Sequence, residues 1–450
     1  MQRYSKYKDS GVKWLGEIPS HWEVKRLGKI CSFSKGLQFT KADLVEDGVP
    51  VVSYGQVHAK YNSRTHMSND LIRYVPGDIA YGNENSKVGI GDFIVADTSE
   101  DVDGCGNMAF NDCRTDLYGG YHTILIKNLQ IQNQKFLAYL FNSNTWRAQV
   151  RNLVNGVKVY TINRDILKSS YVVIPPNKEQ NVIVDYLDSA VSVIDNAIAQ
   201  QQKMIDLLNE RKQIIINDAV TKGLDPKAKM KDSGIDWIGQ IPEHWEISVF
   251  KHLFNTRTGI TFTKEQLSES GAPVISYGQI HSKDNWGASI NPILIRHIPQ
   301  SLTKGKDSAI AIKGDFLFAD TSEDFEGCGN NVYVDTEEPV YAGYHTILAK
   351  CINKECGQYL AYLFASSKWR GQVRSMVNGV KVYSVTQTIL NDALVILPPI
   401  SEQKEIANYV TKKVVVINEA IDRCKKRIKL LQERKQIIIN DVVTGKVKVA

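Results

Sequence analysis

Three short segments of the sequence carry the residue types that contact nucleic acids. Ser53-Tyr-Gly-Gln56 places a glutamine, whose amide can pair with adenine, next to an aromatic ring. Trp146-Arg147 and Arg151 put two guanidinium groups one helical turn apart, a spacing that suits phosphate contacts. Asn155-Gly-Val-Lys-Val-Tyr160 joins a turn dipeptide to a lysine and a stacking ring. These segments predict a nucleic-acid surface, although a turn, a solvated helix face and a plain hairpin would use the same residues.

The same three segments occur a second time, 223 residues further along the chain. Their counterparts are Ser276-Tyr-Gly-Gln279, Trp369-Arg370 with Arg374, and Asn378-Gly-Val-Lys-Val-Tyr383. The candidate DNA-contacting residues are therefore paired across the two copies: Tyr54, Gln56, Arg147, Arg151, Lys158, Tyr160, Tyr277, Gln279, Arg370, Arg374, Lys381 and Tyr383.

The repeat extends over nearly the whole sequence, which identifies a tandem duplication. The opening Trp14-Leu-Gly-Glu-Ile-Pro-Ser-His-Trp-Glu23 returns at 237–246, and Gly91-Asp-Phe-Ile-Val-Ala-Asp-Thr-Ser-Glu-Asp101 returns at 314–324. Residues 59–90, in contrast, align poorly with 282–313. Each copy is thus domain-sized, with a shared frame and a private segment, the name used below for 59–90 and 282–313.

No catalytic signature accompanies these motifs. The sequence lacks a phosphate-binding loop, a dinucleotide fingerprint, an H-E-x-x-H zinc motif, a nucleophile elbow and a C-x-x-C pair. The acidic run at 97–103 could hold a cation, but turn chemistry explains it better, and Cys105 between two glycines is best interpreted as a turn. His58 and His122 are best interpreted as core or interface histidines. We therefore predict neither a catalytic residue nor a metal site.

Composition indicates an ordinary globular protein. The 450 residues are 43% hydrophobic and 23% charged, with a net charge of +6 that permits nucleic-acid binding without requiring it. Seven scattered cysteines do not resemble a disulfide framework, so we interpret them as reduced thiols. The polar first ten residues and the absence of a long apolar run predict a cytoplasmic protein.

Within a copy, the first 175 residues or so predict a compact mixed domain that positions the candidate residues. Short β-branched and aromatic runs at 49–54, 92–96, 122–126 and 171–174 indicate strands, and 134–150 is helix-like.

A long helix follows the Pro175-Pro176 pair in copy one and Pro398-Pro399 in copy two. Its apolar positions recur at alternating spacings of four and three, which is typical of a coiled-coil seam. The predicted seam, which would pack the two helices together or face a partner, comprises Ile194, Ile198, Ile205, Leu208, Ile215, Ile417, Ile421, Ile428, Leu431 and Ile438.

Two such seams in a duplicated chain favour antiparallel packing about a pseudo-two-fold axis. The predicted fold is therefore mixed α/β, with two similar globular domains at the ends of a two-helix antiparallel coiled-coil rod. The expected boundaries are 1–174 for domain 1, 175–223 for helix 1, 224–236 for a linker, 237–396 for domain 2 and 397–450 for helix 2.

The duplicated Trp-x-Gly-x-Ile-Pro-x-His-Trp openings, the two globular halves and the two heptad helices ending in Glu-Arg-Lys-Gln-Ile-Ile-Ile-Asn-Asp resemble the specificity subunits of type I restriction-modification systems. The resemblance spans essentially the whole chain. It implies that the globular halves are target recognition domains for a split double-stranded DNA target, and that the helices set the spacer between half-sites.

The resemblance also implies partners and a division of labour. The helices would dock two modification subunits that transfer methyl groups from S-adenosylmethionine to adenine, and restriction subunits would join them. This chain would bind no cofactor and catalyse nothing. Because its two recognition domains are evident copies, half-sites contacted by frame residues should share bases, while the private segments could make them differ.

Two other classes of function stay open on the sequence alone. A coiled-coil adaptor without sequence-specific DNA binding would explain the helices, and a methyltransferase or nuclease with an unfamiliar motif would explain the globular domains. Binding of S-adenosylmethionine by the isolated chain would favour the enzyme, and salt-dependent binding to a defined DNA target would exclude the adaptor.

Overall fold

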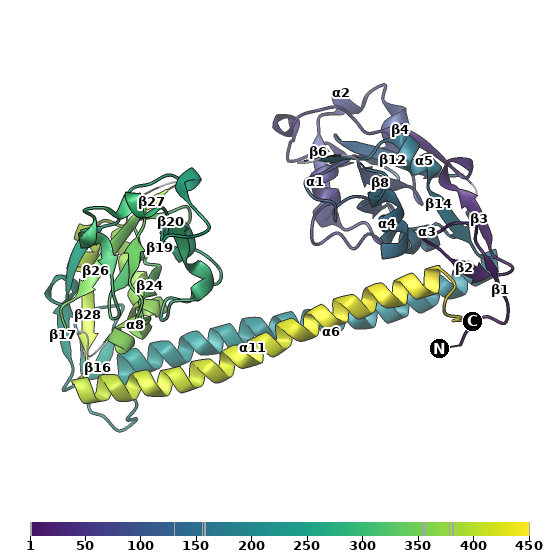
Figure 1. The fold of residues 1–450 in the computed structure, drawn as a ribbon. Coiled ribbons are helices and arrows are strands. Elements are labelled where there is room, and N and C mark those ends of the chain that lie inside the picture. The colour runs from purple at the N-terminus through teal and green to yellow at the C-terminus, as the bar shows by residue number, and fades with distance from the viewer. Residues whose placement is uncertain are drawn as a thin grey trace. The chain divides into compact units, whose positions relative to one another are not determined.

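A computed structural model describes residues 2–129, 131–154, 156, 159–353, 357–377, 379 and 382–449. The contacts divide the chain into two units: unit 1 comprises 1–201 and 426–450, and unit 2 comprises 202–425. Each unit holds one globular domain together with part of each of two long helices, α6 (Asn177–Lys222) and α11 (Ile400–Val443) (Figure 1). The described part of the chain has no helix long and apolar enough to cross a membrane.

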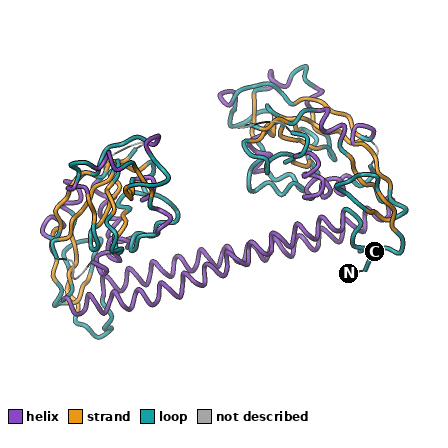
Figure 2. Tube along the Cα trace, viewed as in Figure 1, coloured by secondary structure: helices purple, strands orange, loops and turns teal. Residues whose placement is uncertain are grey.

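Globular domain 1 is built from short strands and short helices (Figure 2). In chain order they are β1 (Tyr7–Asp9), β2 (Glu17–Pro19), β3 (Glu23–Arg26), β4 (Cys31–Lys35), β5 (Val49–Val52), α1 (Tyr54–Val57), β6 (Arg73–Val75), α2 (Gly77–Ala80), β7 (Lys87–Val88), β8 (Phe93–Ala96), β9 (Thr98–Ser99), β10 (Met108–Phe110), β11 (Leu117–Gly119), β12 (Thr123–Asn128), α3 (Gln134–Asn142), α4 (Asn144–Arg151), β13 (Tyr160–Thr161), α5 (Arg164–Ser169) and β14 (Tyr171–Ile174).

Globular domain 2 repeats this order apart from the helix in its private segment. Its elements are β15 (Met230–Asp232), β16 (Gln240–Pro242), β17 (Glu246–Val249), β18 (Phe254–Thr258), β19 (Ala272–Ile275), α7 (Tyr277–Ile280), β20 (Arg296–Ile298), β21 (Ile310–Ala311), β22 (Phe316–Ala319), β23 (Thr321–Ser322), β24 (Asn331–Tyr333), β25 (Val340–Ala342), β26 (Thr346–Cys351), α8 (Gly357–Ala365), α9 (Ser367–Met376), β27 (Tyr383–Ser384), α10 (Gln387–Asp392) and β28 (Leu394–Leu397).

Two four-stranded sheets organise each domain. In domain 1, β10-β8-β12-β4 is antiparallel, whereas β6-β5-β11-β7 contains one parallel pair, β5 with β11. Because side chains alternate along a strand, β8 buries Phe93 and Val95 against α3 and buries Ile94 in a separate cluster with the second sheet. Domain 2 has the equivalent orders β18-β26-β22-β24 and β20-β19-β25-β21. The predicted strands and the mixed fold class are thereby confirmed.

The long helices lie within the ranges expected for them, 175–223 and 397–450, and α11 ends at Val443. α6 and α11 start directly after the proline pairs, and each is followed closely by a glycine with positive φ, Gly223 and Gly445, both at 74°. Within unit 1, α6 residues 183–191 and α11 residues 439–443 share one hydrophobic cluster, and Asp195 of α6 pairs with Lys435 at 2.8 Å. Positions rise along α6 as they fall along α11, so the helices are antiparallel there.

Two predicted elements need correction. The helix expected over 134–150 is two helices, α3 and α4, because the Ser143 side chain accepts a hydrogen bond from the Trp146 N–H and starts a new helix. The expected linker at 224–236 is partly sheet, since β15 pairs with β16 in the register Lys231↔Ile241. The same hairpin opens domain 1 as β1 and β2.

Candidate nucleic-acid interface

Several predicted contact residues converge on one loop of domain 1, residues 97–107, here called the acidic loop. Tyr160 on β13 pairs with Ser99 of this loop, and Arg151 on α4 donates from Nη2 to the Asp103 carbonyl at 2.7 Å. Tyr54 on α1 lines the same hollow as residues 98–104. Segments that are far apart in the sequence thus meet at the acidic loop. Its copy in domain 2 is residues 320–330.

The predicted arginines lie on one helical face but point at the acidic loop. Arg147 is only 6% exposed, and its Nη2 donates to the Asp103 carbonyl and, at 2.6 Å, to Asn107 Oδ1. Burial lowers the pKa of Arg147 to about 9, with nearby Arg64 and Arg151 adding to the shift. Arg147 and Arg151 therefore hold the acidic loop through the Asp103 carbonyl, and this pair of arginines is called the arginine clamp below. Their role as phosphate contacts stays a prediction.

Domain 2 has the same clamp with one contact fewer. Arg370 and Arg374 on α9 both donate to the Glu326 carbonyl, and Arg374 also pairs with the Glu326 carboxylate at 2.8 Å. Burial lowers the pKa of Arg370 to about 10. The counterpart of the Arg147 bond to Asn107 is not among the hydrogen bonds of the described residues.

The remaining candidates have different surroundings. Gln56 and Gln279 cap their own short helices, because their Oε1 atoms accept the N–H of Ser53 and of Ser276. Tyr160 is half-buried against the domain core, and Tyr383 packs edge-on against Phe325 at 5.5 Å between ring centroids. Lys158 and Lys381 lie outside the described residues. The contact role of all four described residues stays a prediction.

A hollow of about 660 Å³ opens between α1 and the acidic loop. Its described lining residues are Tyr54, Gly55, His58, Thr98, Ser99, Glu100, Asp101, Asp103, Gly104, Asn107, His122 and Val159. The charged groups of this described lining are the carboxylates of Glu100, Asp101 and Asp103, which makes the hollow rich in hydrogen-bond acceptors.

His58 forms the fixed part of the hollow. Its Nε2 lies 2.8 Å from the Thr98 carbonyl, and its Nδ1 lies 3.0 Å from Asn107 Nδ2. Since a carbonyl only accepts and an amide nitrogen only donates, His58 carries its proton on Nε2 and both ring nitrogens are engaged. His281 has the same pair of partners, Thr321 and Asn330, at 2.8 and 3.1 Å.

His122 lies across the hollow in a strained backbone conformation. Its φ is 54°, a left-handed value that costs a residue with a side chain about 1 kcal/mol. The ring packs edge-on against Tyr54 at 5.5 Å, its Nδ1 is 3.3 Å from Asp97 Oδ1, and the side chain is 58% exposed. His345 repeats all of this, with φ 53° and an Asp320 distance of 3.2 Å.

Sequence reasoning did not select these histidines. His58 fits the interpretation of a satisfied histidine, but His122 is more than half exposed and strained, which that interpretation does not explain. The available signal was the second copy, since His, Asp and Asn recur at identical spacing in both domains. Chemical type alone could not separate a lining histidine from a core one.

The cysteine of the acidic loop is buried, in keeping with its interpretation as part of a turn. Cys105 is 0% exposed, and burial raises the pKa of its thiol, as it does for Cys328 in domain 2. The described residues contain no group of three or more His, Cys, Asp or Glu side chains that could hold a metal ion.

The predicted seam follows the packed side of the helices in each unit. Ile194, Ile205, Ile417 and Ile421 are buried, and the other seam isoleucines and leucines are half-buried. Neighbouring positions such as Val193 and Leu430 are 67% and 65% exposed.

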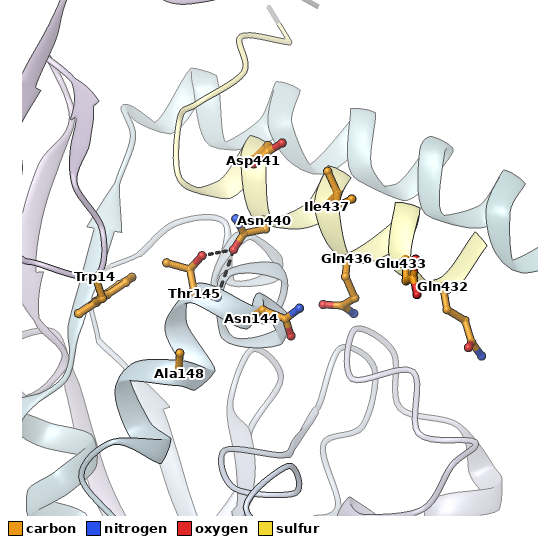
Figure 3. A pocket seen from close by; sticks show the side chains of 10 residues that line it. All are labelled: Trp14, Asn144, Thr145, Ala148, Gln432, Glu433, Gln436, Ile437, Asn440 and Asp441. Atoms are coloured by element: carbon orange, nitrogen blue, oxygen red, sulfur yellow. Dashed lines mark hydrogen bonds between the residues drawn. The ribbon is translucent and has the colours of Figure 1, made fainter. Parts of the chain in front are cut away.

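A groove of about 770 Å³ lies in unit 1 where α4 meets α11 (Figure 3). Thr145 at the start of α4 faces Asn440, whose Oδ1 accepts the Thr145 N–H at 3.1 Å and also the Thr145 hydroxyl. Trp14 and Gln436 line the groove, and Ile437 is 60% exposed beside them. Gln436, Ile437 and Asn440 belong to the helix end that is identical in both copies, Glu433–Asp441 and Glu210–Asp218.

A family model described as the type I restriction modification DNA specificity domain matches residues 19–205 and again residues 242–429. The chain belongs to this family. The two matches each cover one globular domain except its opening hairpin, and part of the helix that follows it, which agrees with the duplication.

Curated relatives match most of the chain. The putative type I restriction enzyme MjaX specificity subunit of Methanocaldococcus jannaschii is 25% identical, over 98% of each chain. The type I restriction enzyme EcoKI specificity subunit of Escherichia coli is 22% identical, over 88% of this chain and 82% of its own.

A solved structure shows the same fold. A chain from a study of complex assembly and conformational transition in the type I R-M system matches with a TM-score of 0.65 and 15% identity, over 96% of this chain and 99% of its own.

Proposed function

We propose that this chain is the DNA sequence-specificity subunit of a type I restriction-modification complex, in which its two globular domains read the halves of a bipartite target. The observation that carries this proposal is the presence of two copies of the specificity domain in one chain. Each copy pairs a sheet-built domain with a long helix, so one polypeptide can present two readers to one DNA duplex.

The acidic loop and the arginine clamp support a recognition role for each domain. A base-reading surface has to hold its groups in a fixed position, because each base pair contributes only about 1–3 kcal/mol of discrimination. Arg147 and Arg151 hold the Asp103 carbonyl from one side, and the β9–β13 pair holds residues 98–99 from another. The hollow is thereby built on a rigid frame.

The chain itself is non-catalytic in this proposal and acts in the cytoplasm. Methyl transfer from S-adenosylmethionine to adenine is the work of modification subunits, and restriction subunits complete the complex. The helix ends are evidence for two docked modification subunits, because the segments Glu433–Asp441 and Glu210–Asp218 have identical sequences. Each segment exposes one isoleucine, Ile437 at 60% and Ile214 at 51%. Identical surfaces offer identical docking sites.

The adaptor alternative is not favoured, because both globular domains match a DNA specificity family. An unrecognised catalytic site has no constellation of residues to support it among the candidates described above.

The test is a genome-wide map of methylated adenine in cells that express this chain with the methyltransferase subunit encoded beside it. We expect a split motif with a fixed spacer that disappears when this chain is omitted. Methylation that persists unchanged in its absence would reject the proposal.

A further inference from the structure

The hollow is almost perfectly duplicated, whereas the private segment beside it is not. Of the 12 lining residues in domain 1, 11 have an identical counterpart 223 residues later, and the exception is Asp103, which is matched by Glu326. In the private segments only 7 of 32 aligned positions are identical. The hollow and the private segment adjoin at the end of α1. Residues of α1 line the hollow, His58 caps the C-terminus of α1, and the private segment starts directly after it, at residue 59.

The hydrogen bonds within the hollow determine which of its groups are available to a ligand. Both nitrogens of His58 are engaged by Thr98 and Asn107. The Nδ1 of His122 lies 3.3 Å from Asp97 Oδ1 without the geometry of a hydrogen bond, whereas the equivalent Nδ1 of His345 hydrogen-bonds with Asp320 Oδ1 at 3.2 Å. The Nε2 of His122 has no hydrogen-bond partner in the described part of the chain. The Asp103 carboxylate is 93% exposed, with Arg151 3.4 Å away. The available groups are therefore one imidazole nitrogen and carboxylate oxygens, next to the edge of the Tyr54 ring.

The charge of the hollow selects the kind of DNA group that fits. Glu100, Asp101 and Asp103 line it, and no lysine or arginine is among its described lining residues. A phosphate would be repelled there, whereas an exocyclic amino group would be accepted, as carboxylates accept from cytosine N4. Every base pair presents one such amino group in the major groove, on either adenine or cytosine.

We propose that the hollow is a base-reading site common to both recognition domains, in which His122 and its counterpart His345 accept the amino group of one base pair that the two half-sites share. This inference rests on the proposed function. The private segments, which differ, then read the bases that distinguish the half-sites.

The first test compares the methylation preference of the complete complex with its His122→Gly and His345→Gly variants. Glycine removes the imidazole and adopts the left-handed backbone without strain, so the fold is kept. We expect His122→Gly to reduce the preference for one base pair of one half-site about ten-fold, and His345→Gly to do the same at the equivalent position of the other half-site. His21→Ala is the matched control, because His21 is also exposed and paired with a carboxylate, Glu179 at 2.8 Å, but lies outside the hollow.

The second test removes the amino group from the DNA. A target in which the adenine or cytosine of the shared pair is replaced by an analogue without its exocyclic amino group should bind the wild-type complex about ten-fold more weakly. The same replacement should cost the His122→Gly complex nothing further in that half-site. This coupling is a result that a merely structural histidine would not produce.

Three results would overturn the inference while leaving the proposed function intact: half-sites without a common base pair, variants that relax unrelated positions or none, or variants that lose the methyltransferase subunit without a change in base preference. The last result would identify the hollow as a protein-docking site. A wild-type complex without any split motif would instead reject the proposed function itself.

Discussion

The arginine clamp makes a quantitative prediction, because its two copies differ by one hydrogen bond. Arg147 donates to both the Asp103 carbonyl and Asn107 Oδ1, whereas Arg370 donates to the Glu326 carbonyl. Replacing either arginine by methionine keeps most of the side-chain volume and removes the donors. In both domains the loop carbonyl keeps its second arginine, Arg151 or Arg374.

The cost of the two substitutions follows from the groups left behind. Arg147→Met removes a charged hydrogen bond to Asn107, worth about 1.5–3 kcal/mol, and leaves the Oδ1 of a side chain that is 6% exposed without that donor. The substitution also removes the free-energy cost of keeping a charged guanidinium out of water, which offsets part of this loss. We expect a net cost of about 3 kcal/mol for opening the acidic loop of domain 1, and about 1 kcal/mol for Arg370→Met in domain 2.

Hydrogen exchange followed by mass spectrometry measures both loops in one experiment. The amides of Cys105 and Asn107 are bonded within the loop, to Val102 and Gly104, so they report its opening. At about 1.4 kcal/mol per factor of ten, Arg147→Met should accelerate their exchange roughly 150-fold and Arg370→Met should accelerate the domain 2 amides roughly five-fold. Equal acceleration in the two loops, or no acceleration with Arg147→Met, would refute the assignment of the extra bond.

Four further perturbations test other parts of the structure. Asn418→Asp should stabilise unit 2 by about 1 kcal/mol in urea unfolding, because it gives Lys212 a carboxylate partner like the one that Asp195 gives Lys435. The matched change Asp195→Asn should destabilise unit 1 by the same amount. A destabilising effect of Asn418→Asp would contradict the pairing. Burial, helped by the charge of Lys425, lowers the pKa of Lys212 below its value in the unfolded chain. Between these two pKa values the unfolded chain binds more protons, so the wild-type free energy of unfolding should rise as the pH increases toward about 10.4. This rise should be smaller in Asn418→Asp. Gly36→Ala should lower stability by about 2–3 kcal/mol in the same assay, because the added Cβ would lie 2.0 Å from the Gly120 carbonyl oxygen. Gly77→Ala, whose added Cβ would meet no atom within 4 Å, should be tolerated. Equal effects of the two changes would be inconsistent with the packing. Exposed Cys113 should be alkylated well before Cys31, since burial raises the Cys31 pKa to about 12; the reverse order in peptide mapping would argue against the described core.

The repeat and the periodic segments made most of the fold predictable from the sequence. The proline pairs and the spacing of four and three located both long helices, and β-branched runs located β5, β8, β12 and β14. The break at Ser143 was missed because the apolar pattern continues across it, and only the side-chain cap on Trp146 shows where the second helix starts. The hairpin β15–β16 was missed because Met230–Asp232 is only three residues long and exposed.

The candidate site was predictable in outline but not in the roles of its residues. Their spacing of one helical turn selected Arg147 and Arg151 as cations on one face, and both lie on α4 four residues apart. Their direction depends on the Asp103 carbonyl, which long-range folding brings to them and which no local pattern announces. His122 was interpreted as a core or interface histidine for the same reason, since its left-handed backbone and its nearby Asp97 are properties of the assembled domain.

The claim that this chain sets the DNA sequence to be methylated is tested most directly by exchanging a private segment. The frame anchors both segments alike: Asp112 accepts the Met67 N–H and Asp335 accepts the Ile290 N–H, each at 2.9 Å, so residues 282–313 can replace 59–90 without a change in length. In cells that express the methyltransferase subunit, we predict that the methylated motif of this exchange chimera changes in one half-site only and approaches an interrupted palindrome built from the other. A folded chimera that methylates the unaltered wild-type motif would contradict the account.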